Sequence, residues 1–255
     1  MNRKTPSLTR RDLLAGATAL AALGMAPLRA AAAFDAAGAR RRQLAAPDGR
    51  VIEIWDWQPR GRVRGLVTFS HGAASAPWKY PPFITAWVAA GYRVVAPLHV
   101  DSTDHPDTAK FAGFRSWRAR LEDMRAIGAD LGDTYIATGH SYGGLTALVQ
   151  GGAQAVVPDG VIAPLRDARV RAVVAFSPPA PIPGLIEAAG YATLAVPALI
   201  QTGTADVPPG VTQPDGWRGH LVPYEAAAAD GSRYGLVLEG ADHYFGGEIC
   251  RPELP

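Results

Sequence analysis

The sequence has almost no cysteine, and this already excludes one class of fold. Cys250 is the single cysteine among 255 residues, so no intramolecular disulfide can form and a small disulfide-rich fold is excluded. Glycine follows no fixed period, which excludes a collagen-like chain, while 48% hydrophobic and 19% charged residues are ordinary values for a folded protein. A chain of this length can bury one large core or at most two small ones.

A long apolar run of the kind that spans a membrane is also missing near the N-terminus. Residues 13–28 are uncharged, but this run has 16 residues and much Ala and Gly, whereas a spanning helix needs roughly 20 strongly apolar residues. The run follows Arg10 and Arg11 and precedes residues 31–33, which are all alanine. Basic, apolar and small segments in that order are typical of a signal peptide, and paired arginines favour the twin-arginine type, which exports folded proteins.

We therefore predict a removable signal over residues 1–33 and a mature catalytic domain over residues 34–255. This predicts a periplasmic or secreted protein without a stable membrane anchor, whose partners include the twin-arginine export machinery. A general secretory signal and a retained anchor are the alternatives. Residues 1–33 hold five basic residues and one acidic residue, and the rest of the chain holds 20 basic and 22 acidic residues. The mature domain thus has no basic surplus for binding nucleic acid.

From about residue 50, short β-rich runs alternate with longer helical ones, which predicts an α/β fold with a mainly parallel sheet and helices on both faces. We expect strands over residues 51–57, 63–69, 92–98, 134–138, 171–176, 196–202 and 234–238. We expect helices over residues 82–90, 116–129, 142–151 and 224–230. Because the later strand runs are compact and apolar, we expect them to be buried on both faces.

The segment after residues 134–138 suggests a nucleophile. Gly139-His140-Ser141-Tyr142-Gly143 matches G-x-S-x-G and stands between a predicted strand and a predicted helix. A sharp strand-to-helix turn lifts the serine hydroxyl clear of the sheet, and glycine on either side permits the turn to pack closely. Amides at the start of the following helix can stabilise a developing negative charge. Since the bare pattern also arises by chance, its position carries the prediction that Ser141 is the nucleophile.

Ser141 needs a general base, and the base needs a carboxylate that orients it. His243 is the best-placed base because it follows the last predicted strand in a glycine-rich loop. Asp206 follows the strand over residues 196–202, so we expect it to face the same edge of the sheet. The other candidate bases are His220, His99 and His105, and the other candidate acids are Asp215, Glu239 and Asp242.

The loop after residues 63–69 lies where the oxyanion loop of this architecture is found. Two donors are needed there, and we expect the backbone amides of Ala73 and Tyr142 to supply them. His71 is expected to brace this loop rather than to react. Trp78 and Tyr80 are expected either to form an aromatic wall for the substrate or to pack the loop. The proline-rich segment over residues 178–183 is likewise either a wall of a cleft or a rigid turn.

The sequence offers no strong cofactor or metal motif. Residues with metal-binding chemistry gather after the strand over residues 92–98, but their spacing fits no strong metal pattern. We therefore expect a solvated or substrate-facing loop there, and neither a metal nor a cofactor in the protein. A glycine-rich phosphate-binding motif does not occur. The residues of this loop are His99, Asp101, Asp104, His105 and Asp107.

The motifs resemble those of the α/β-hydrolase superfamily: HGAAS at 71–75, GHSYGG at 139–144, GTAD at 203–206 and GADH at 240–243. The resemblance covers residues 50–247 and is greatest to bacterial dienelactone-hydrolase-like and platelet-activating-factor-acetylhydrolase-like proteins, with cutinase-like polyester hydrolases nearby. It implies the α/β-hydrolase fold, with Ser141, Asp206 and His243 as the catalytic triad. Dienelactone hydrolases proper use cysteine where this chain has Ser141, and cutinase-like enzymes commonly carry a disulfide that this chain cannot form. The absence of a long insertion over residues 151–196 implies no large lid.

The leading hypothesis is an exported serine esterase that cleaves a small-molecule or polymeric carboxylic ester through an acyl-enzyme. We expect a rate that rises with pH as His243 loses its proton, in the ordinary histidine range of roughly 6 to 7. The same site could instead serve an acyltransferase or a perhydrolase. A hypothesis of another class is a non-catalytic periplasmic binding protein, although the presence of all three catalytic residue types in order speaks against it.

Overall fold

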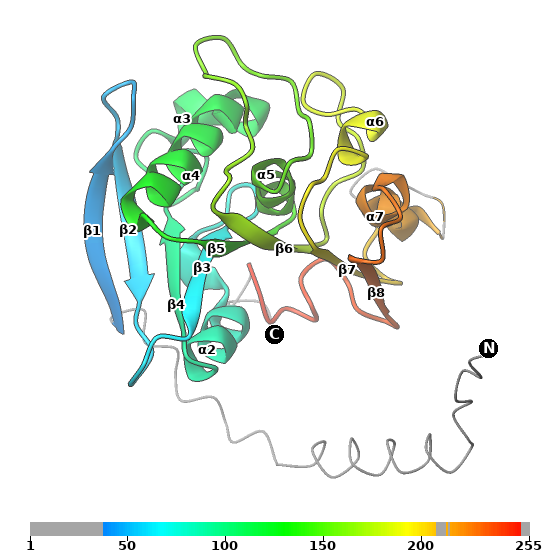
Figure 1. Cartoon of the computed structure of the whole chain (residues 1–255), viewed down its shortest axis with the longest axis horizontal. Helices are drawn as coiled ribbons and strands as arrows, with labels where there is room; N and C mark the ends of the chain where they lie inside the picture. The colour runs from blue at the N-terminus through cyan, green and yellow to red at the C-terminus, as the bar shows by residue number, and fades with distance from the viewer. Residues whose placement is uncertain (1–37, 208–212, 214, 251–255) are drawn as a thin grey trace, which may run out of the picture. The chain divides into compact units, whose positions relative to one another are not determined.

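The computed structural model describes residues 38–207, 213 and 215–250, and within them eight strands form one sheet (Figure 1). The predicted signal over residues 1–33 lies outside the described residues. The order across the sheet is β1-β2-β4-β3-β5-β6-β7-β8. The strands are β1 (Ala39–Ala45), β2 (Val51–Trp57), β3 (Gly65–Ser70), β4 (Tyr92–Pro97), β5 (Tyr135–His140), β6 (Val170–Phe176), β7 (Ala198–Gly203) and β8 (Arg233–Leu238).

The sheet is mainly parallel, as predicted. β2 pairs antiparallel with β1 and with β4, and every pair from β4 across to β8 is parallel. The direction of winding reverses at β3, because β4 lies on one side of it and β5 on the other. In open α/β sheets, such a switch point opens a crevice beyond the carboxyl ends of the strands, which is where ligands bind.

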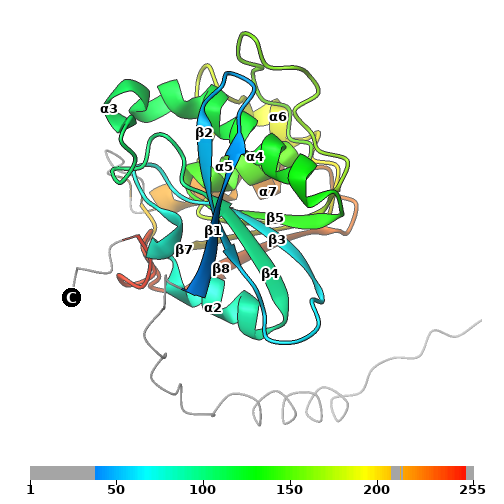
Figure 2. The same ribbon diagram turned by 90° about the vertical axis from the view of Figure 1, so that its left-hand side faces the viewer.

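Helices cover both faces of the sheet, also as predicted. α2 (Pro81–Ala89) lies on one face, whereas α4 (Trp117–Leu131) and α5 (Tyr142–Gln150) lie on the other, as both views show (Figures 1 and 2). The short helices are α3 (Thr108–Phe111), α6 (Ala188–Tyr191) and α7 (Val222–Ala226). Among the residues that the structure describes, no helix is long and apolar enough to cross a membrane.

The main core lies between α5 and the central strands. All nine residues of α5 are buried, because this helix packs on β5 and β6 and is covered by neighbouring segments on its other sides. Leu145 and Leu148 of α5 are fully buried beside Ala137 of β5 and Val173 of β6. The start of α5 is therefore held rigidly against the sheet, which matters for the site that it carries.

Two strands differ from the expectation. β1 lies before residue 50 and was not predicted. Its three consecutive arginines, Arg40 to Arg42, have the composition of an exposed loop. Because β1 is an edge strand, these arginines stay near solvent. We expected the run 234–238 to be buried, and this is wrong. Within the described residues β8 pairs with β7 alone, and its Tyr234, Leu236 and Val237 are exposed, since an edge strand has a neighbour on one side only.

Candidate active site

Ser141 lies in a tight turn between β5 and α5, beside the switch point of the sheet. Its backbone has φ 53° and ψ −121°, a conformation that is rare for a residue with a side chain and costs of order 1–3 kcal/mol. The Ser141 amide donates to the carbonyl of Phe176 at 2.8 Å, and its carbonyl accepts from the amide of Leu145 at 3.2 Å. The surroundings therefore hold the strained turn that a nucleophile elbow requires.

The glycines of the motif are required by close packing of backbone on backbone. A Cβ atom at Gly143 would overlap the carbonyl of Ser70, and one at Gly139 would overlap the carbonyl of Gly143. β3, β5 and α5 thus approach one another more closely than any side chain permits. The G-x-S-x-G spacing is explained here by geometry, independently of any chemistry.

Two backbone amides near Ser141 are available to a ligand. Neither the Ala73 amide nor the Tyr142 amide donates to another group within the described part of the chain, and both residues line the cavity that Ser141 lines. The loop passes close to the serine, because a Cβ at Gly72 would lie 3.6 Å from Ser141 Cβ. An oxyanion formed at Ser141 could accept hydrogen bonds from these two amides.

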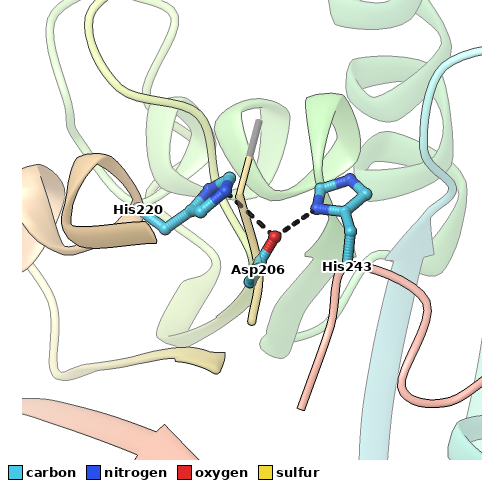
Figure 3. Close-up of side chains that lie close together, drawn as sticks. All are labelled: Asp206, His220 and His243. Atoms are coloured by element: carbon cyan, nitrogen blue, oxygen red, sulfur yellow. Dashed lines mark hydrogen bonds and ion pairs between the residues drawn. The ribbon is translucent and has the colours of Figure 1, made fainter. Parts of the chain in front are cut away.

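The tertiary structure brings His243 and Asp206 together. His243 Nδ1 lies 2.7 Å from Asp206 Oδ1 (Figure 3), and Asp206 Oδ2 accepts from the hydroxyl of Thr202 at 2.8 Å. Because a carboxylate only accepts, Nδ1 carries the proton and Nε2 remains as the basic atom of the His243 ring. His243 and Ser141 line the same cavity. The three residues named from the sequence therefore meet at one site.

A second imidazole, which the sequence suggested only as an alternative base, lies on the same carboxylate. His220, in the 3-10 helix η4 (Gly216–Leu221), places Nε2 3.0 Å from Asp206 Oδ1 (Figure 3). The ligand atoms of Asp206, His220 and His243 lie within 4.8 Å of one another, close enough in principle for a metal ion. The two short distances, however, are those of a hydrogen bond and an ion pair. Protons alone complete this arrangement, so we do not assign a metal.

The pKa of Asp206 reflects both imidazoles. Burial by itself would raise this pKa, but the hydrogen-bonding imidazoles of His220 and His243 hold it well below its usual range. Asp206 therefore stays ionised at every pH at which the protein would work. Asp242, an alternative acid from the sequence, instead accepts hydrogen bonds from the amides of Tyr244 and Gly246.

The loops of the nucleophile and of His243 are joined by a buried chain of hydrogen bonds. Burial lowers the pKa of His140 to about 3, so the ring is neutral; its Nε2 donates to the carbonyl of His243 at 2.9 Å. Its Nδ1 then accepts from the hydroxyl of Tyr80 at 3.1 Å. The same hydroxyl oxygen accepts from the Gly72 amide and from the Cys250 thiol, each at 2.8 Å. Tyr80 thereby ties the oxyanion loop to the loop that carries His243.

Trp78 and Tyr80 are not among the residues lining the cavity, so they do not form the aromatic wall that was one expectation. Tyr80 is fully buried behind the oxyanion loop, and Trp78 packs on Trp55 with ring centroids 4.6 Å apart. Tyr80 therefore packs the loop, which was the other expectation, whereas Trp78 packs against β2. Aromatic side chains do line the cavity, but they are Phe114, Tyr142 and Tyr244.

The proline-rich segment after β6 is a wall of the cavity, which confirms that interpretation of residues 178–183. Pro179 to Ile182 line it, opposite the oxyanion loop residues Ala73 and Ala74. The cavity has a volume of about 720 Å³, within the range of small-molecule sites. Its described lining includes no lysine, arginine, aspartate or glutamate, and its ionisable side chains include His140, His220 and His243.

The loop after β4 is more deeply buried than expected. His99 and Asp101 do not face solvent or the cavity but belong to a buried network, because the fully buried Arg120 of α4 reaches them from below. Both Asp101 oxygens accept from Arg120 at 2.9 Å, and Arg120 also donates to the carbonyls of His71 and Gly72 at 2.8 and 3.1 Å. No sequence pattern indicates this role, because Arg120 is one of three arginines in α4 and arginine usually lies at the surface.

Ionisation in this network follows from its pairings. Burial opposes the charge of Asp101, but Arg120 lowers the pKa of that carboxyl to about 2. His99 is neutral, because burial and Arg120 lower its pKa well below the usual value, and its Nδ1 lies 2.8 Å from Asp123. His71 accepts from the His99 amide at 3.0 Å, which confirms that it braces the loop. The buried ion pair of Arg120 and Asp101 therefore supports the oxyanion loop on its inner side.

The strand order, the elbow at Ser141 and the Asp206–His243 pair together define the α/β-hydrolase fold. Solved structures with this fold resemble the chain. A propionate-bound thermophilic esterase from Thermogutta terrifontis has a TM-score of 0.60 and 20% identity, over 83% of this chain and 86% of that one. A candidate dienelactone hydrolase from Klebsiella pneumoniae has a TM-score of 0.58 and 14% identity, over 82% and 89%.

A third neighbour is a puromycin-hydrolysing peptidase from Mycobacterium tuberculosis, with a TM-score of 0.57 and 17% identity over 84% of this chain. The chain spans 37% of the length of that peptidase. At these identities the likeness establishes the fold, which esterases and other serine hydrolases share. No family model and no curated protein matches the sequence.

Proposed function

We propose that this protein is a serine esterase that cleaves neutral carboxylic esters through an acyl-enzyme. One observation carries the proposal: Ser141, at a strained elbow, shares a cavity with His243, whose Nδ1 is hydrogen-bonded to Asp206. A strained serine, an oriented imidazole and a buried carboxylate are the parts that acyl transfer needs. The esterase neighbours have the same fold, which supports the proposal at that level.

In the first half of the proposed reaction, Ser141 Oγ passes its proton to His243 Nε2 and forms a bond to the ester carbonyl carbon. The carbonyl electron pair moves to oxygen, where the amides of Ala73 and Tyr142 donate to it. When the carbonyl re-forms, the ester C–O bond breaks and the leaving oxygen takes the proton from His243. An alcohol departs and the acyl group stays on Ser141.

In the second half, water attacks the acyl carbon while His243 Nε2 accepts its proton. Collapse of this intermediate breaks the bond to Ser141 Oγ, which recovers the proton, and releases the carboxylic acid. Asp206 keeps the Nδ1 proton throughout and stabilises the imidazolium that forms twice per cycle. If an alcohol, an amine or hydrogen peroxide replaced water, the same steps would give acyl transfer or perhydrolysis.

The cavity supports a neutral substrate. A charged group bound in the described lining would find no unpaired counter-ion, because the lining includes no lysine, arginine, aspartate or glutamate, and both His220 and His243 already face Asp206. The apolar surface from Phe114 and the segment 179–182 suits an acyl chain or ring. A volume of about 720 Å³ accommodates a small ester or one segment of a polyester.

Export by a twin-arginine signal also remains a proposal, and it rests on residues 1–33 alone. Nothing in the described residues bears on it. Expression with the full N-terminus would place the protein in the periplasm or medium and shorten it by about 30 residues. The intact mass needed for the labelling experiment below gives the mature N-terminus as well.

A fluorophosphonate tests the proposed nucleophile. The probe phosphonylates a serine only when an adjacent base activates it, so we expect one adduct per chain, mapped by mass spectrometry to Ser141. Ser141→Ala should lose the adduct and at least 1,000-fold in kcat. Ser75→Ala is the matched control for labelling, because Ser75 lines the same cavity without lying at an elbow; it should keep the adduct.

Activity is measured in parallel on a neutral aryl ester and on a matched ester that carries a carboxylate. We expect the neutral ester to have the higher kcat/KM. A folded protein that neither acquires the adduct nor cleaves either ester would overturn the proposal and favour the non-catalytic binding protein. Product analysis with added alcohol or peroxide separates hydrolysis from acyl transfer.

A further inference from the structure

His220 and His243 share one carboxylate, although they come from different segments of the chain. Asp206 Oδ1 lies 2.7 Å from His243 Nδ1 and 3.0 Å from His220 Nε2, so the carboxylate stands between two imidazoles (Figure 3). Asp206 is fully buried and His220 nearly so. A triad needs only one of these histidines. The presence of the other has to be explained by what it does to Asp206.

The partners of His220 determine its protonation. Its Nδ1 lies 2.8 Å from the carbonyl oxygen of Pro178, which can only accept, so Nδ1 carries a proton. Its Nε2 lies 3.0 Å from Oδ1 of the ionised Asp206, outside hydrogen-bond geometry but within ion-pair distance, so the negative charge of the carboxylate favours a proton there as well. A ring with both nitrogens protonated is an imidazolium. His220 therefore supplies a buried positive charge beside the same Asp206 oxygen that His243 approaches, with the two ring centroids 5.6 Å apart.

On this basis we propose that His220 is a positioning residue, an imidazolium that fixes Asp206 and weakens the hold of that carboxylate on a protonated His243. The inference rests on the proposed esterase function. A carboxylate already neutralised by one cation attracts a second less strongly, and the two imidazolium rings repel each other. Protonation of His243 is thus disfavoured, which keeps Nε2 available as a base at lower pH.

Burial and charge agree with this assignment. Burial alone would lower the pKa of His220, but Asp206 more than offsets it, and the pKa is raised. His140 at the end of β5 packs on His243 with ring centroids 4.7 Å apart and stays neutral, with its pKa lowered to about 3 by burial. Other ionisable residues of the segments that carry the two histidines are Asp215 and Arg218 beside His220, and Asp242 and Tyr244 beside His243.

Of these neighbours, two are engaged elsewhere. Arg218 stacks over Trp217, with its guanidinium carbon 4.6 Å from the ring centroid, and Asp242 accepts from amides of its own loop. The ring of Tyr244 meets His243 edge-on at 5.3 Å between centroids. Asp206 is therefore the acid for which the two histidines compete.

His220→Gln tests the inference through a pH profile. Glutamine is neutral and keeps an amide near Asp206. The charge of the carboxylate is then no longer offset by His220, so Asp206 should stabilise a protonated His243 more strongly. We expect the midpoint of the acidic limb of kcat/KM to rise by about one pH unit, with the plateau kcat reduced by less than about tenfold. His105→Gln is the matched control, since His105 lines a different cavity; its profile should coincide with that of the wild type.

An unchanged midpoint in folded, fluorophosphonate-reactive His220→Gln would overturn the inference, whatever happens to kcat. A purely structural histidine would lower kcat without moving the midpoint. If this variant does not fold, nitrogen-15 NMR of the wild-type histidines still decides the matter. Two protonated ring nitrogens on His220 at pH 7 are expected, and a single protonated nitrogen would contradict the inference.

The NMR result also separates the inference from the proposed function. A wild-type protein without esterase activity but with a doubly protonated His220 would refute the function and leave the ion pair intact. A wild-type esterase with a neutral His220 would do the reverse. Both measurements use the same purified full-length protein.

Discussion

Tyr80 shows how one residue can hold a site that it does not line. Its hydroxyl accepts from the Gly72 amide and donates to His140, and His140 in turn donates to the carbonyl of His243. Burial raises the pKa of Tyr80 well above its ordinary value, so the hydroxyl keeps its proton and remains a donor. The nucleophile loop and the base loop are therefore aligned by a neutral network.

Removing this hydroxyl should loosen the site. Tyr80→Phe leaves the Gly72 amide buried without its partner, which costs about 1–3 kcal/mol, and leaves His140 Nδ1 with the weaker Cys250 thiol, 3.5 Å away. We expect a lower free energy of unfolding in urea and a kcat reduced by about tenfold or more, with KM changed little. Trp78→Phe is the control, because Trp78 packs on Trp55 away from the cavity. Equal kcat for the two variants would contradict the role given to Tyr80.

At the residue scale, sequence reasoning named Ser141, Asp206 and His243 because each follows a predicted strand within two or three residues of a glycine. It could not rank Trp78 against Phe114 as a cavity residue, since both are aromatic residues in loops. Nor could it assign His220, whose partner is reached only when η4 folds back over Pro178. Local sequence patterns indicate which residue types could react. They do not indicate which loops come into contact, because those loops are far apart in the sequence.

At the scale of elements, the turn from β5 to α5 decides the geometry of the nucleophile. α5 begins one residue after Ser141, and its first turn lies against the end of β3, where Gly143 faces the backbone of Ser70 and His71. The clash that a Cβ would cause there is with carbonyl groups and not with a flexible side chain. Ser141 keeps its strained backbone conformation because β3, β5 and α5 pack closely around it.

Gly143→Ala should therefore disrupt the elbow. The added methyl has to push α5 away from β3, so we expect a loss of about 1–3 kcal/mol or more in the free energy of unfolding. The amide of Tyr142 and the hydroxyl of Ser141 shift with the helix, and fluorophosphonate labelling should slow by at least tenfold. Gly38→Ala is the control, because a Cβ at Gly38 meets nothing within 4 Å. Normal labelling of Gly143→Ala would refute this account.

Most of these elements were predictable. The parallel strands from β3 to β7 and the helices α2, α4 and α5 lie within one to two residues of the expected bounds, because their periodicities are long and clear. The short helices α3 and α6, of four residues each, have too few residues to show a period. The exposed surface of β8 was not predictable either, since the apolar run of an edge strand looks like that of a central one.

Over the whole molecule, the pair Arg120–Asp101 connects parts of the chain that are distant in sequence. Arg120 comes from α4, Asp101 from the loop after β4, and the carbonyls that Arg120 also binds belong to the loop after β3. The guanidinium lies 4.5 Å from the centroid of the Tyr142 ring, at the start of α5. Arg120 therefore both supports the loop beside the site and contributes to the stability of the fold.

Arg120→Met should be strongly destabilising near neutral pH. Asp101 would remain buried and ionised without its partner, which costs about 3–5 kcal/mol. In the wild type the pKa of Asp101 is about 2, below the ordinary 3.8. Its contribution to stability is therefore present above about pH 4 and is lost as the pH falls through 2.

The measurement is the free energy of unfolding in urea at several values of pH. In Arg120→Met, the free energy of unfolding should no longer fall between pH 4 and pH 2. Asp101 has no ion pair to lose in this variant when it becomes protonated. Arg115→Met is the control, since Arg115 is exposed before α4; we expect a change within about 0.5 kcal/mol. If the two variants had equal stability at pH 7, the buried pair would not have the importance assigned to it.

The sequence by itself determined the fold class, the order of the central strands and long helices, and the three residues of the candidate triad. These features depend on periodicity and on glycine spacing, which involve only residues that are close together in the sequence. Only the tertiary structure decided that Asp206 faces two imidazoles, that Tyr80 lies behind the site and that the described cavity lining includes no lysine, arginine, aspartate or glutamate. Each of these facts depends on where loops far apart in the chain meet, and packing of the whole domain sets that.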